Sequence, residues 1–178
     1  MIPNPLHPAI VHFPIVLMFL VPMAALVALW SIRRGAKPLR AWAGVAALAA
    51  ALSASALLAK ETGEQQQDRV EHVVAERAIH THEEAADLFF ILSLVSLGVV
   101  GVGLAPGRLG TAGRVASTVA AAALVVAGWR VGASGGELVY RDGAAQAYVS
   151  GTAGGAAGPA PERHEGRQGD RDDDGLSR

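Results

Sequence analysis

The sequence contains no cysteine among its 178 residues. This absence excludes disulfide frameworks, thiol catalysis, thiolate zinc sites, iron–sulfur clusters and covalently attached c-type haem. The formal net charge is −1, which leaves no basic surface of the kind that binds nucleic acid. Charged residues make up only 17% of the chain, below the roughly 25% usual for soluble domains, and 51% is hydrophobic. A water-soluble enzyme of this size is therefore not expected.

Charge is also missing from three long apolar runs, over residues 1–32, 41–59 and 88–107. Uncharged runs of about 18 residues or more indicate membrane-spanning helices. We predict an all-α fold, a four-helix transmembrane bundle over residues 1–144 with spans at about 9–32, 41–60, 82–105 and 113–134. Residues 145–178 are rich in Gly, Ala, Pro, Arg and Asp and are predicted to form a disordered tail.

The predicted spans differ in what they contribute to packing. Of the residues in 41–59, most are Ala, Gly or Ser, and the span at 113–134 has a similar composition. Small residues let helices approach closely in lipid. We therefore expect these two spans to pack tightly against each other.

The loops between the spans differ in charge. Residues 33–40 carry four cations and no acid, and Arg108 and Arg114 likewise lie in a stretch without an acid. Residues 60–81 carry five acids and three cations. The positive-inside rule then places the first and third loops in the cytoplasm and both termini outside. The N-terminus lacks the positive region of a secretory signal, so we expect a retained first span and a multi-pass protein in the lipid bilayer of a bacterial inner membrane.

Ligand-capable side chains gather at the outer ends of the predicted spans. His7 and His12 begin the first span and His82 begins the third, while Glu64 and Arg130 lie near the outer ends of the second and fourth. The cytoplasmic ends carry no histidine and no acid. This one-sided distribution predicts a His/Glu cluster at the outer membrane face.

Local motifs suggest where two of these helices begin. The run from Thr81 to Glu84 matches a capping box, which predicts that Thr81 is the N-cap and that His82 lies in the first turn. Pro14 is a natural first helical residue, which predicts that His12 lies just outside the regular helix.

Two kinds of cofactor fit such a cluster. Two histidines from different helices can ligate the iron of haem b axially, and we expect His12 and His82 to do so, with Arg130 available to a propionate. Alternatively, nitrogen and oxygen ligands hold a Cu, Zn or Fe ion, and the candidates are His7, His12, Glu64, His82 and Glu83. In this arrangement we expect Glu83 to orient His82. Either site would serve electron transfer or metal handling, with a membrane or periplasmic redox protein as partner.

Other interpretations remain open from the residues alone. The same side chains can form a structural hydrogen-bond network, and the protein would then be a non-catalytic scaffold or accessory subunit of a membrane complex. A transporter is disfavoured because no ionisable residue lies mid-span, and four helices would need a homo-oligomer to line a path. The sequence shows no nucleophile–base pair of the kind that would indicate an enzyme. His72 and His80 receive no role.

Short motifs give the chain a family resemblance. The opening run PLHPAIVHFP (Pro5–Pro14), Thr62-Gly63-Glu64, His82-Glu83-Glu84 and GGELVY (Gly135–Tyr140) resemble signatures of the bacterial membrane-protein family catalogued as domain of unknown function 2231. The similarity covers roughly residues 3–143 and implies a four-helix inner-membrane protein without an established activity. The motif positions carry over to His7, His12, Gly63, Glu64, His82, Glu83 and Gly136. Some relatives are joined to Rieske-type iron–sulfur domains, which implies redox or haem chemistry.

Overall fold

The computed structural model describes residues 6–148, which form helices and no strand. Its four long helices are α2 (His12–Arg33), α3 (Pro38–Glu64), α5 (Glu76–Val102) and α6 (Gly107–Tyr140), and single turns form α1 (His7–Ile10) and α4 (Gln67–Val70). The α1–α2 segment, α3, α5 and α6 are each long and apolar enough to cross a membrane. The predicted all-α, four-span fold is therefore confirmed. The predicted disordered tail lies, from residue 149 onward, outside the described residues.

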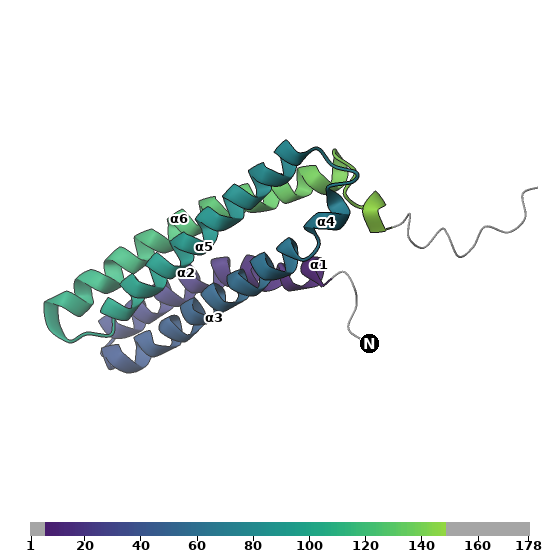
Figure 1. Cartoon of the computed structure of the whole chain (residues 1–178). Coiled ribbons are helices and arrows are strands. Elements are labelled where there is room, and N and C mark those ends of the chain that lie inside the picture. Colours follow the sequence, from purple (N-terminus) through teal and green to yellow (C-terminus); the bar gives the residue numbers. More distant parts are fainter. Residues whose placement is uncertain (1–5, 149–178) are drawn as a thin grey trace, which may run out of the picture.

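The long helices form two antiparallel hairpins, α2–α3 and α5–α6 (Figure 1). Gly35 lies in the first hairpin turn with a φ of 97°, and Gly107 lies in the second with a φ of 66°. Both glycines can adopt this left-handed backbone conformation because they lack a Cβ. Both ends of the described chain and the α3–α4–α5 connection lie at the opposite end of the bundle (Figure 1). We call this the terminal end, and we call the end with the two turns the hairpin end.

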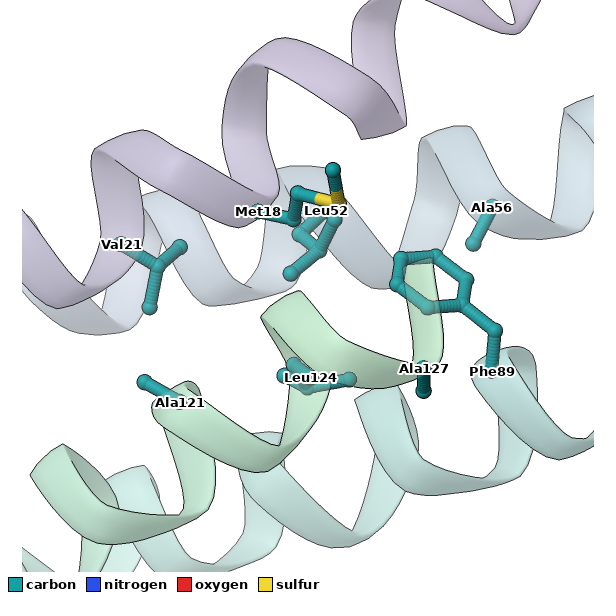
Figure 2. Close-up of a cluster of buried hydrophobic side chains, with 8 residues drawn as sticks. All are labelled: Met18, Val21, Leu52, Ala56, Phe89, Ala121, Leu124 and Ala127. Atoms are coloured by element: carbon teal, nitrogen blue, oxygen red, sulfur yellow. The ribbon is translucent and has the colours of Figure 1, made fainter. Parts of the chain in front are cut away.

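The four long helices pack in a ring, in the order α2, α3, α5 and α6. The largest buried cluster lies inside this ring and takes side chains from all four helices (Figure 2). In this arrangement α3 and α6 lie across the bundle from each other, so the prediction that they pack together is wrong. Their small residues instead allow each of them to pack against both α2 and α5.

Three helix ends differ from the prediction. α5 begins at Glu76 with Ala75 as its N-cap, so the predicted capping box at Thr81 is wrong. Its extra first turn is supported by Ile79, which packs at the terminal end with Val74 and Ala144. Thr81 donates its hydroxyl to a main-chain carbonyl one turn earlier.

The other two differences also affect the site. α2 begins at His12 rather than at Pro14, because proline is tolerated throughout the first turn, where its missing N–H is not needed. α6 continues to Tyr140, six residues beyond the predicted end of its span. These extensions add helix at the terminal end of the bundle.

The buried positions of α2 recur in α5. Four buried residues of α2 are each followed 75 positions later by a buried residue of α5. The pairs are Pro14 and Phe89, Met18 and Ser93, Val21 and Ser96, and Ala25 and Val100.

The same relation holds between α3 and α6, with an offset of 72 positions, because the second hairpin has three fewer residues between its repeated positions. The pairs are Trp42 and Arg114, Val45 and Ser117, Ala49 and Ala121, Leu52 and Leu124, and Ala56 and Gly128. The two hairpins are therefore structural repeats that run in the same direction, related by an approximate twofold axis along the bundle. Because the paired residues mostly differ in type, the sequence alone does not display the repeat.

Candidate functional site

His7 lies half-buried at the start of α1, against the last turns of α3. Its Nδ1 lies 2.8 Å from the carbonyl oxygen of Ala59 and 3.4 Å from the hydroxyl of Thr62. A carbonyl can only accept, so Nδ1 is the donor. The ring rests on Gly63, where an added Cβ would lie 3.1 Å from the His7 Cε1. Glycine at this position therefore lets the imidazole lie close to the backbone of α3.

His82 lies half-buried in the second turn of α5, against the last turns of α6. Its Nδ1 lies 3.0 Å from the hydroxyl of Ser134, and that hydroxyl donates to the carbonyl of Val131 at 3.1 Å. Since the Ser134 proton is engaged by Val131, the Ser134 oxygen accepts from Nδ1. The ring rests on Gly135, where an added Cβ would lie 3.1 Å from the His82 Cε1.

The two histidine environments are counterparts in the repeat. The offset of 75 positions relates the histidines, and the offset of 72 relates their hydroxyl and glycine partners: Thr62 with Ser134, and Gly63 with Gly135. Each imidazole uses Nδ1 within its own hairpin, and neither Nε2 has a hydrogen-bond partner among residues 6–148. Both rings lie at the terminal end of the bundle, in equivalent positions of the two hairpins. We call His7 and His82 the histidine pair.

Three predicted site residues lie outside this arrangement. His12 is exposed in the first turn of α2, and Arg130 is exposed on α6 without an ion pair in the part of the chain that the structure describes. Glu83 is half-buried next to His82 and makes no hydrogen bond within that part. Their predicted roles as ligands or orienting groups therefore remain predictions.

Glu64 takes part in an ion-paired group at the terminal end. Its carboxylate lies 2.6 Å from the ammonium of Lys60, and the same ammonium lies 2.9 Å from Asp87. Lys60 thus joins α3 to α5, in two contacts that are partly exposed to solvent. This pairing satisfies the Glu64 charge without a metal.

The remaining candidates do not complete a metal site. Among residues 6–148, no group of three or more His, Cys, Asp or Glu side chains could hold a metal ion. His72 and His80 are both exposed. At the terminal end, residues 6–148 therefore place the two imidazoles and the ion-paired group of Lys60, Glu64 and Asp87.

The sequence did not predict which residues hold these imidazoles. Ser134 was not a candidate, and His12 was preferred to His7. A usable signal was present, because a hydroxyl residue followed by glycine occurs near the end of the second and of the fourth span, as Thr62-Gly63 and Ser134-Gly135.

Comparison with known proteins places the chain in a family. The model of the family described as "Predicted membrane protein (DUF2231)" matches residues 3–148. No curated protein and no solved structure matches the chain. The matched region includes all six helices and both members of the histidine pair. As its short motifs predicted, the chain belongs to the DUF2231 family of predicted membrane proteins.

Proposed function

We propose that this membrane protein binds haem b through the histidine pair, with His7 and His82 as axial ligands, and that it transfers electrons. The observation that carries the proposal is the hydrogen bonding of the two rings. Each Nδ1 donates to its own hairpin, so each neutral ring keeps its lone pair on Nε2. Histidines that bind metals commonly donate their other ring N–H to a fixed acceptor, which sets the tautomer and the ring orientation.

The number of available ligands favours haem over a bare ion. Protein sites for zinc or copper take three or four protein ligands, and no such group occurs among residues 6–148. Haem supplies four nitrogen ligands itself and needs only two axial ones. Because the chain has no cysteine, the haem would be held without thioether bonds.

The surroundings of the pair also suit an apolar macrocycle. The largest buried cluster, which includes Ala56, Phe89 and Ala127 (Figure 2), lies farther along the same helices toward the middle of the bundle. Haem bound there would supply one-electron chemistry, and the protein would contribute orientation and shielding from water.

The proposal includes a placement in the membrane. The cations at the hairpin end predict that this end faces the cytoplasm, so the histidine pair would lie near the outer face of an inner membrane. An electron partner would then be a membrane or periplasmic redox protein.

A visible spectrum of the purified chain tests the proposal. We expect the full-length protein, produced in haem-replete cells and purified in mild detergent, to show a Soret band and about one haem b per chain. His7→Ala and His82→Ala should each lower haem content at least tenfold, and free imidazole should restore the low-spin spectrum. His12→Ala is the matched control and should keep the haem, because His12 is exposed.

Two outcomes would overturn the proposal. One is a folded wild-type protein without a Soret band and with substoichiometric iron. The other is a haem spectrum that survives both substitutions in the histidine pair. If, in addition, these substitutions abolish a co-purifying complex, the pair serves a scaffold or accessory subunit instead.

A further inference from the structure

Arg114 is a buried cation near the hairpin end of α6. It is only 5% exposed, and its Nη2 donates to the carbonyl of Ala105 at 3.2 Å. Its Nε is buried without a hydrogen-bond partner. The ion pairs found among residues 6–148 involve other side chains, so no carboxylate in that range neutralises Arg114.

A guanidinium group in this situation calls for an anion. Arginine stays charged in proteins, and removing its charge from water without a counter-charge is costly. The residues around the two hairpin turns offer no counter-charge, because residues 33–40 and 103–117 contain six cations and no acid. Any negative charge that pairs with Arg114 therefore comes from outside the described chain.

Arg114 also lines a groove with a volume of about 1280 Å³, which we call the arginine groove. Its walls include the apolar residues Leu39, Leu104 and Val115, and Arg108 stands at its edge. The first turn of α6 lies in the same wall, and its N-cap, Pro106, makes no side-chain hydrogen bond to it. Free N–H groups at a helix N-terminus favour a bound anion.

The counterpart position in the first hairpin is occupied by an uncharged residue. Trp42, the counterpart of Arg114 in the first hairpin, is 0% exposed and donates its Nε1 proton to the carbonyl of Val100 at 3.0 Å. The polar atom of Trp42 is satisfied within the protein, whereas the Nε of Arg114 is not. The difference points to a ligand on the second hairpin.

We propose that the arginine groove binds an anionic phospholipid. The phosphate faces Arg114 and the N-terminus of α6, and the acyl chains lie along the apolar wall. A lipid fits better than free phosphate because most of the groove surface is apolar and because Leu39 and Val115 are exposed on membrane helices. This inference is independent of the proposed haem site, which lies at the other end of the bundle.

Native mass spectrometry of the full-length protein tests the proposal. The delipidated protein is titrated with phosphatidylglycerol, with phosphatidylcholine of the same chain length, or with inorganic phosphate. We expect one phosphatidylglycerol to bind at least tenfold more tightly than phosphatidylcholine, and inorganic phosphate to compete weakly. Arg114→Gln should abolish the preference for phosphatidylglycerol. Arg40→Gln is the matched control, because Arg40 is an exposed cation at the same end that does not line the groove.

The results can contradict the proposal in three ways. Equal binding of the two lipids, or an unchanged preference in Arg114→Gln, would overturn it. Inorganic phosphate that binds as tightly as phosphatidylglycerol would assign the groove to a free anion and would also overturn it. If Arg114→Gln does not fold, Arg108→Gln replaces it and should weaken phosphatidylglycerol binding severalfold, with no change as the contradicting result.

Discussion

The first hairpin, α2–α3, and the second, α5–α6, bury side chains at the same positions but differ in what they place there. Where the first hairpin has Met18, Val21 and Val45, the second has serines at 93, 96 and 117. Two of these serines, at 93 and 117, donate to carbonyls of their own helices. The hydroxyl of Ser96 is buried without a partner.

At the terminal end, the two hairpins use the same chemistry. Each places an imidazole on a glycine and holds its Nδ1 with a carbonyl or hydroxyl of the neighbouring helix. Inside the bundle and at the hairpin end the side chains diverge, although the backbone positions still correspond. The repeated register therefore reflects helix packing, and the repeated histidine environment is the basis of the proposed haem site.

Among the substitutions that test the differences between the two hairpins, we expect Trp42→Ala to have the largest effect on stability. Trp42 is fully buried and its Nε1 is hydrogen-bonded, so its truncation should lower the free energy of unfolding by about 3–5 kcal/mol, the range for large core residues. Reversible unfolding in detergent, followed by circular dichroism, measures this loss. Trp30→Ala is the control, since Trp30 is 59% exposed and its cation–π contact is with the exposed Arg34. Similar losses in the two variants would show that the buried tryptophan does not anchor the first hairpin.

A second, smaller effect is expected from exchanging apolar and polar counterparts. Ser96→Val removes a buried hydroxyl that lacks a partner and installs the residue type of its counterpart, Val21, so it should stabilise the protein by about 1 kcal/mol. Val21→Ser should destabilise it by a similar amount or more. The same unfolding assay measures both. Ser93→Val is the control and should gain less, because the Ser93 hydroxyl bonds to the carbonyl of Phe90. A loss of stability in Ser96→Val would indicate that its hydroxyl has a partner in the folded protein.

The fold was largely predictable because uncharged apolar runs of spanning length carry a strong signal. Where helices end, and which helices touch, was less predictable. α5 begins six residues earlier than predicted, and Ile79 in this added segment packs with Val74 and with Ala144, which is distant in the sequence. The ring order of the helices, which separates α3 from α6, likewise depends on contacts that helix composition does not encode.

For the candidate site, the sequence named both members of the pair among its candidate ligands at this end of the bundle. It identified His82, and it ranked His12 above His7. His7 lies against α3, whereas His12 is exposed in the first turn of α2. The two histidines are five residues apart in helical backbone and therefore lie on different faces, but periodicity alone does not say which face contacts α3. The matching partners, Thr62 and Ser134, each precede a glycine in the sequence, but only the structure shows that they bond to the histidines.

The smallest expected effect concerns a contact that breaks the symmetry of the terminal end. Lys60 contacts Glu64 and Asp87, whereas Gly132, its counterpart by the same offset, has no charge to offer. The side chains of Lys60 and Asp87 are 30% and 51% exposed, so solvent screens their attraction. We expect a double-mutant cycle of Lys60→Met and Asp87→Asn to give a coupling free energy of about 0.2–1 kcal/mol, decreasing with added salt.

The pair of Glu137 and Arg141 provides the matched control for this cycle. Its atoms lie 3.3 Å apart within one helix end, and the side chains are 61% and 77% exposed. Its coupling free energy should be smaller still, because a longer and more exposed contact gains less from the attraction of its charges. If the Lys60–Asp87 coupling exceeds about 2 kcal/mol, beyond the range for exposed pairs, the contact is desolvated in the folded protein. The ion-paired group would then help to hold the two hairpins together at the terminal end. Because the second hairpin has no cation at the position that corresponds to Lys60, this contact would make the terminal end less symmetric than the two histidine environments suggest.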